Sequence, residues 1–300
     1  MLTRSMRALL PATLPLPLLE LAMIVTWSSG FVGARYSIDH APAFLVVFWR
    51  CLLVSAVLLP WVWREIRAMP RAFLLRQGAI GLLAMGGYLA GVIQGIALGV
   101  PAGLAALIAD LLPIGTAVLG VLLGHQRLSA QAWCGLAIGL GGVVLVTFDA
   151  LQVGSAPPWA YLLPLLGMLS LAIATVWRKS SGGAGSLSML ASLWLQCGVS
   201  AFCFAIFSLF DSGLAPVLST GFAYSVLWTA GLSTLGGYGL YWICLQRSSA
   251  TRVASVLYLS PAVTLLWSWR LFDEPLSWAI AAGVAISGLG ITLVIRSERA

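Results

Sequence analysis

The chain has 300 residues, of which 60% are hydrophobic and only 8% are charged, and its formal net charge at pH 7 is +7. Soluble domains contain roughly 45–50% apolar and about 25% charged residues, so a water-soluble fold is excluded. The sixteen basic residues are scattered between apolar segments and form no stripe or arm. This pattern excludes a nucleic-acid partner and makes the lipid bilayer the expected environment of nearly the whole chain.

Apolar segments separated by proline, glycine and charged residues follow one another along the chain. The first runs to about Tyr36, which is too long for a signal peptide, and it lacks a small-residue cleavage site. A bilayer is spanned by ~20 apolar residues, and a lone spanning segment must be helical to satisfy its backbone hydrogen bonds. The sequence predicts an all-α membrane protein with ten transmembrane helices, near 17–36, 43–63, 74–97, 101–124, 129–148, 158–177, 187–210, 220–245, 250–271 and 276–295.

The basic residues predict how these helices are oriented. With the N-terminus in the cytoplasm, thirteen of the sixteen Lys and Arg residues lie inside, Arg35 and Arg270 lie outside, and Arg50 falls within the second helix. Cytoplasmic loops carry an excess of positive charge in membrane proteins. We therefore expect a multi-pass protein of the cell inner (cytoplasmic) membrane with both termini in the cytoplasm.

The chain repeats itself. Ala106–Phe148 superposes without a gap on Ala254–Arg296, 148 residues further on, with thirteen identities, and the Gly-Gly-Tyr of residues 86–88 recurs at 236–238. A repeat unit of five helices is odd, so two fused copies enter the membrane in opposite orientations. The sequence predicts two inverted five-helix repeats, residues 1–150 and 151–300, an architecture typical of secondary transporters that work by alternating access.

Two regions also carry a family resemblance. Residues 27–31 read Trp-Ser-Ser-Gly-Phe and are followed by Pro42 and Arg50, and both halves end in a proline, a short loop, Leu-Ser and a glycine. Over essentially the whole chain these features resemble the EamA branch of the drug/metabolite transporter superfamily, most of all the aromatic amino acid exporters called YddG. The family loop usually reads Gly-Glu-x-Leu, which Asp273-Glu274-Pro275-Leu276 matches in part and residues 124–128 do not.

The resemblance implies an exporter of small metabolites, with aromatic and other apolar amino acids as the expected substrates. Exporters of drugs or organic cations on the same fold are the alternative. A channel is a further one, which would be distinguished by flux that fails to saturate. An intramembrane enzyme is disfavoured because the chain has two histidines and no metal-binding, nucleophile or phosphate-loop motif. We expect no cofactor and no metal.

Two prolines occupy equivalent positions of the repeat, Pro113 and Pro261. Each removes a backbone donor and frees the carbonyl four residues earlier, so each predicts a kink. Such interruptions open backbone groups toward substrate in transporters, although proline is equally common as a plain bend in membrane helices. Asp110 precedes the first proline and its repeat mate Tyr258 precedes the second, so a carboxylate and a phenol are candidates for substrate binding.

Arg50 and Asp110 lie at a similar depth, ~10–14 Å from the outer side at 1.5 Å per residue. Each charge costs roughly 2.5–3.5 kcal/mol inside a bilayer. The two side chains are therefore predicted to form a structural ion pair. The alternative is that Asp110 binds a substrate ammonium or a proton.

Aromatic side chains inside the predicted helices complete the candidate site. Trp27, Tyr88 and Tyr238, with Tyr258, are candidates to line a cavity and stack on a flat or apolar substrate, whereas packing and lipid contact are the alternative roles. Small residues at a spacing of four predict close helix packing for residues 87–99 and for the two terminal helices of the repeats. The latter helices are expected to contact neighbours in the chain or a second protomer in a homodimer.

Overall fold

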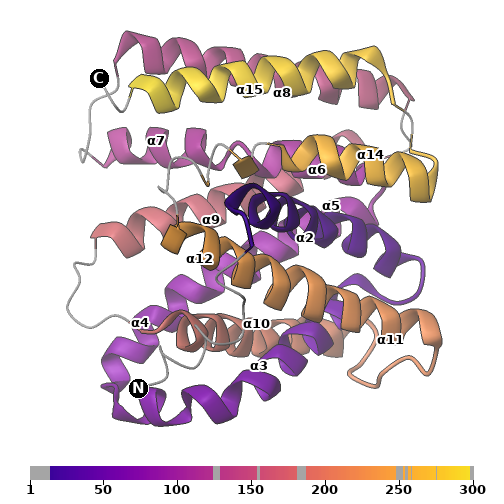
Figure 1. Cartoon of the computed structure of the whole chain (residues 1–300). Coiled ribbons are helices and arrows are strands. Elements are labelled where there is room, and N and C mark those ends of the chain that lie inside the picture. The colour runs from indigo at the N-terminus through magenta and orange to yellow at the C-terminus, as the bar shows by residue number, and fades with distance from the viewer. Residues whose placement is uncertain are drawn as a thin grey trace.

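A computed structural model describes residues 14–123, 129–153, 156–180, 187–247, 253, 256–257, 259–274 and 276–297. Within these ranges every regular element is a helix, and Figure 1 shows the helices stacked in layers. The first four spanning regions are formed by α2 (Leu16–Ile38), α3 (Ala43–Ala68), α4 (Arg71–Gly81) with η1 (Leu82–Gly87) and α5 (Tyr88–Ala97), and α6 (Ala102–Ala109) with α7 (Leu112–Leu122).

The remaining elements continue the same pattern. They are α8 (Ala130–Val153), η2 (Pro158–Tyr161), α9 (Leu162–Ser180), α10 (Met189–Asp211), α11 (Thr220–Leu227), η3 (Trp228–Gly237), α12 (Tyr238–Arg247), α14 (Ser260–Phe272) and α15 (Trp278–Ser297). The helix α3 extends to Ala68, five residues past the predicted apolar segment, because Arg64, Glu65 and Arg67 continue its regular turns.

The outer surface of the bundle is apolar. Large side chains such as Leu75, Phe202 and Leu289 are 76%, 72% and 63% exposed. Such a surface is unfavourable in water and matches hydrocarbon. Six helical segments among the described residues are long and apolar enough to cross a membrane, and two shorter apolar helices accompany them, at 130–146 and 278–290. The all-helical fold is confirmed, while the count of ten spans stays a prediction.

Two π-helices interrupt the bundle, and both end at a Gly-Gly-Tyr sequence. The segment η1 lies between α4 and α5, and η3 lies between α11 and α12. A π-turn contains one residue more than an α-turn, which leaves backbone carbonyls open to other partners. In η1 the carbonyl of Leu83 accepts a hydrogen bond from the Ser170 hydroxyl (2.8 Å). In η3 the Thr234 hydroxyl donates to the carbonyl of Thr229, five residues earlier (2.8 Å).

The kinks predicted at the two prolines are present. The fourth spanning region breaks between α6 and α7 at Asp110 and Leu111, and α14 begins one residue before Pro261. The Leu111 N–H bonds the Ile108 carbonyl (3.2 Å), and the Leu259 N–H bonds the Val256 carbonyl (3.1 Å). These two bonds are 148 residues apart in the chain, so the same backbone break recurs at the repeat spacing.

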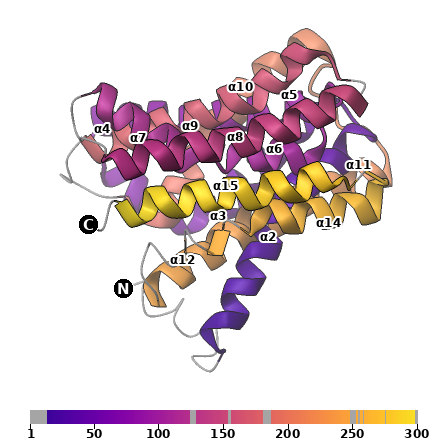
Figure 2. The same cartoon turned by 90° about the horizontal axis from the view of Figure 1, so that it is seen from above.

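The helices α8 and α15 pack against each other along their length (Figures 1 and 2). A Cβ atom on Gly142 would lie 2.6 Å from the Gly283 carbonyl oxygen, and a Cβ atom on Gly290 would lie 2.5 Å from the Gly135 carbonyl oxygen. The Ser287 hydroxyl donates to the Gly139 carbonyl (3.1 Å). The small residues of these two helices therefore contact each other within the chain, and the homodimer stays a prediction.

The glycine stripe of residues 87–99 packs as predicted. A Cβ atom on Gly91 would lie 2.7 Å from the backbone nitrogen of Gly167, and one on Gly95 would lie 2.8 Å from the Pro164 ring. Only glycine allows the backbones of α5 and α9 to approach so closely. This contact fixes one wall behind the central cavity described next.

Candidate substrate site

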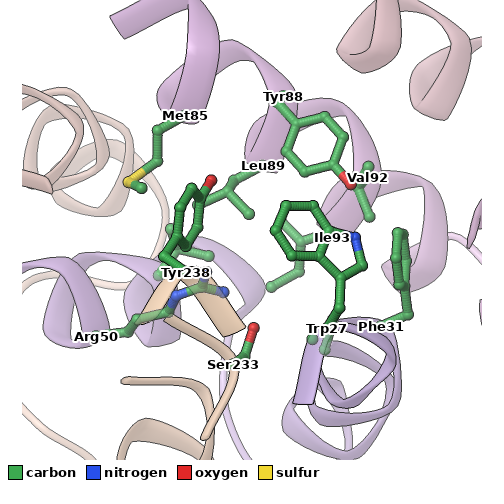
Figure 3. A pocket seen from close by; sticks show the side chains of 13 residues that line it. Trp27, Phe31, Arg50, Met85, Tyr88, Leu89, Val92, Ile93, Ser233 and Tyr238 are labelled. Atoms are coloured by element: carbon green, nitrogen blue, oxygen red, sulfur yellow. The ribbon is translucent and has the colours of Figure 1, made fainter. Parts of the chain in front are cut away.

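A cavity lies at the centre of the bundle, between α2, α3, α5 and the two π-helices (Figure 3). It leaves about 60 Å³ for the centres of water-sized molecules, several times the ~10–15 Å³ that one water requires. Its walls are mostly apolar and aromatic. They are formed by Trp27, Gly30, Phe31, Ala34, Val47, Arg50, Met85, Tyr88, Leu89, Val92, Ile93, Ser233 and Tyr238.

The aromatic part of the cavity comes from three separate regions of the chain. Trp27 lies on α2, and its ring centroid is 5.5 Å from that of Tyr238 and 6.0 Å from that of Tyr241. Figure 3 shows the Tyr88 ring above the Trp27 indole and the Tyr238 ring to its left. Tyr88 and Tyr238 are the first residues of α5 and α12, directly after the two π-helices. The repeated Gly-Gly-Tyr sequence thus places one tyrosine from each half of the chain on the cavity.

Arg50 is the one charged residue among the described side chains that line the cavity. It is only 7% exposed, and its Nε donates a hydrogen bond to the Thr234 hydroxyl (2.9 Å). Thr234 in turn donates to the Thr229 carbonyl, so the hydroxyl is held with its lone pairs toward Arg50. The guanidinium is therefore oriented by the π-helix η3.

Arg50 does not pair with Asp110 in this structure. Among the described residues the two ion pairs are Arg35 with Asp39 and Arg35 with Glu274. Asp110 ends α6 at the helix break, and its Oδ2 atom is buried without a hydrogen-bond partner. The sequence-based prediction paired the two residues because they lie at a similar depth in the membrane. Depth alone does not determine the direction in which each helix presents its side chain.

The structure brings three of the predicted site residues together. Trp27, Tyr88 and Tyr238 line the cavity, and their role in substrate binding stays a prediction, whereas Asp110 is not among the lining residues. Pro261 is buried near the start of α14 and is not among the lining residues, and Pro113 lies near the start of α7. Tyr258 lies outside the described residues.

Sequence reasoning missed nine of the lining residues that the structure adds, among them Phe31, Met85 and Ser233. Phe31 is the last residue of the Trp-Ser-Ser-Gly-Phe motif, so the motif itself was an available signal. A Cβ atom on Gly30 would lie 2.6 Å from the Ser233 hydroxyl oxygen, so the glycine of this motif leaves room for the Ser233 side chain. Met85 and Ser233 belong to π-helices, which periodicity does not predict.

The helix α2 is also anchored by polar contacts beside the cavity. The Ser28 hydroxyl donates to the Ser260 carbonyl (3.1 Å), and the Trp228 indole N–H donates to the Ser29 carbonyl (3.0 Å). Ser28, Ser29 and Ser260 are fully buried. These bonds connect α2 to η3 and to α14, so the wall that carries Trp27 is fixed to two elements of the second half.

A polar cluster joins the ends of α2, α6 and α14. Asp273 follows the last residue of α14 and adopts the left-handed conformation (φ 53°), which glycine adopts more readily than other residues. The EamA loop pattern Gly-Glu-x-Leu has glycine at this position. Glu274 then accepts a hydrogen bond from the Ala102 N–H (3.2 Å) and lies 3.8 Å from the Arg35 Nε. Burial raises the pKa of the Glu274 carboxyl, while the Ala102 N–H and Arg35 act to lower it. This glutamate thus caps α6 from the end of α14.

The apolar surface, the six long apolar helices and the central cavity define a multi-pass membrane protein with an internal cavity. The model of the EamA-like transporter family matches residues 16–148 and 158–296. The chain belongs to this family and is a transporter.

Comparison with known proteins gives relatives of similar length. The "Probable amino-acid metabolite efflux pump" of Escherichia coli (strain K12) is 25% identical over 280 residues, which cover 91% of this chain and 92% of the relative. The "Uncharacterized inner membrane transporter YedA" of the same strain is 27% identical over 274 residues, covering 88% and 86%. A solved structure with 19% identity and a TM-score of 0.65 covers 94% of this chain and 97% of its own and shares the fold.

Proposed function

We propose that this protein is a secondary transporter of the inner membrane that exports aromatic and other apolar amino acids by alternating access. The observation that carries the proposal is the central cavity, in which Trp27, Tyr88 and Tyr238 surround a space that also contains one guanidinium, that of Arg50. An aromatic amino acid has the matching parts, a ring for the aromatic wall and a carboxylate for the cation.

Alternating access requires two halves that exchange conformations, which we assign to residues 1–150 and 151–300 in inverted orientation. The backbone breaks 148 residues apart support this assignment. The packing of α8 on α15 supports it too, because Gly142 contacts Gly283 and their repeat mates, Gly290 and Gly135, contact each other. If each residue is replaced by its equivalent in the other repeat, the same two contacts result. A two-fold axis between the helices requires this.

The choice of amino acids rests on the cavity, the resemblance and a relative. A relative named as a probable amino-acid metabolite efflux pump aligns over 91% of the chain. The cavity has no cluster of basic residues, and phosphorylated sugars would require more than one cation near their dianionic group. Inner-membrane localisation follows the name of the YedA relative and the distribution of positive charge.

The test is flux of labelled phenylalanine and tryptophan in liposomes that contain the purified protein, with and without a pH gradient. We expect flux that saturates with substrate and falls at least tenfold in Trp27→Ala. Trp61→Ala is the matched control, because Trp61 is 53% exposed at the surface of the bundle, and it should transport as the unchanged protein does. Flux of an organic cation or a sugar with none for amino acids would overturn the substrate assignment, and flux that never saturates would indicate a channel.

A further inference from the structure

The guanidinium of Arg50 has unused donors on the cavity side. Arginine has five N–H donors, and here the Nε donor is taken by Thr234. Among the described residues no acceptor is seen for the two terminal nitrogens, and no carboxylate is in ion-pair contact with the group. Arg50 is nonetheless 93% buried, since its exposure is 7%. A buried cation without an anion is unfavourable, so the Arg50 guanidinium favours a negatively charged ligand group in the cavity.

The geometry also selects the kind of anion. The bond from Nε to Thr234 fixes one edge of the planar group, so the terminal nitrogens remain as a pair. Such a pair matches the two oxygens of a carboxylate in a bidentate contact. In the view of Figure 3 the Arg50 guanidinium lies between the Tyr238 ring and the Ser233 hydroxyl, and the Trp27 and Tyr88 rings lie to the right. No described acidic side chain lines the cavity to receive an ammonium.

We propose that the cavity recognises its substrate as an aromatic monocarboxylate, through bidentate binding by Arg50 beside the aromatic wall, and that the substrate's amino group is dispensable for binding. This inference deepens the proposed function, on which its link to amino-acid export rests. Thr234 is the positioning residue, because it orients the guanidinium without contacting the ligand. The cavity then binds aromatic carboxylates that lack an amine and rejects aromatic amines that lack a carboxylate.

Direct binding to the purified protein tests this independently of transport. The probes are 3-phenylpropanoate, phenylalanine, phenylalanine amide and 2-phenylethylamine, measured by calorimetry. We expect the first two to bind with affinities within about tenfold of each other and the two cations at least tenfold more weakly. Charged hydrogen bonds of this kind correspond to about 10- to 100-fold in affinity, so Arg50→Gln should lose that much for both carboxylates.

Further variants distinguish loss of the Arg50 contact from loss of folded protein. Thr234→Val should weaken carboxylate binding less than Arg50→Gln does, and Arg50→Lys should restore only part of the affinity, since an ammonium lacks the planar fork. Arg178→Gln, at an exposed position that contacts Ser192, is the control and should bind as the unchanged protein does. Equal binding of 2-phenylethylamine and 3-phenylpropanoate, or unchanged carboxylate binding in a folded Arg50→Gln protein, would overturn the inference. Carboxylate binding without amino-acid flux would instead refute only the proposed function.

Discussion

The contact between α8 and α15 yields a matched pair of substitutions at adjacent residues. In Gly142→Ala the new Cβ atom would lie 2.6 Å from the Gly283 carbonyl oxygen and 2.7 Å from the Ser287 nitrogen. Both are backbone atoms, so the two helices must separate to admit the methyl group. Overpacking of this kind costs about 1–3 kcal/mol. At Gly141 a Cβ atom would meet nothing within 4 Å, and alanine there should stabilise the helix by up to ~1 kcal/mol.

The difference between the two variants isolates the helix contact, because both gain the same helix propensity. We expect Gly142→Ala to be less stable than Gly141→Ala by about 1–3 kcal/mol in free energy of unfolding. Unfolding in mixed detergent micelles, followed by circular dichroism, measures this difference. If the two variants agree within about 0.5 kcal/mol, α8 and α15 are not in close backbone contact and the reasoning fails.

The remaining predictions concern the polar cluster and the two intramembrane charges. Burial raises the pKa of Glu274, so its contribution to stability is full below its unfolded value of about 4.3 and is lost as pH rises through the folded pKa. The unfolding temperature of the unchanged protein should therefore fall relative to Glu274→Gln across that interval, and parallel pH profiles would contradict this. Asp273→Gly should raise stability by up to ~1 kcal/mol, because glycine adopts the left-handed conformation at no steric cost; a loss of stability in thermal unfolding would show that the Asp273 side chain is needed. Arg50→Gln and Asp110→Asn should have effects on unfolding that add within about 0.5 kcal/mol, since the residues form no ion pair here. A coupling above about 1 kcal/mol would instead establish the pair that the sequence predicts.

The helical fold and part of the site are predictable because they depend on local rules. Apolar length predicts the spanning helices, and the loss of a backbone donor at proline predicts the breaks before Pro113 and Pro261. The glycine stripe of residues 87–99 predicts a close helix contact, and α9 provides it. Trp27, Tyr88 and Tyr238 could be nominated because they are large aromatic residues inside spanning segments.

The partners of Arg50 were not predictable in the same way. The rise of 1.5 Å per residue fixes how deep a side chain lies, but tertiary packing fixes the direction in which it points. Arg50 meets Thr234, a residue 184 positions away in the chain. Nothing in the pattern of apolar residues marks Thr234, because it belongs to a π-helix whose wider turns break the 3.6-residue period.

The π-helices η1 and η3 also determine where the chain tolerates a change in length. Deletion of one residue from a regular α-helix rotates everything beyond it by about 100°, because each turn holds 3.6 residues. A π-turn already holds a surplus residue. Removal of Leu83 from η1 can therefore restore an ordinary α-turn and leave both flanking helices facing as before, whereas removal of Leu89 from α5 would rotate Val92 and Ile93 away from the cavity. Relatives of this chain that are one residue shorter in the third span should have lost that residue from the wide turn.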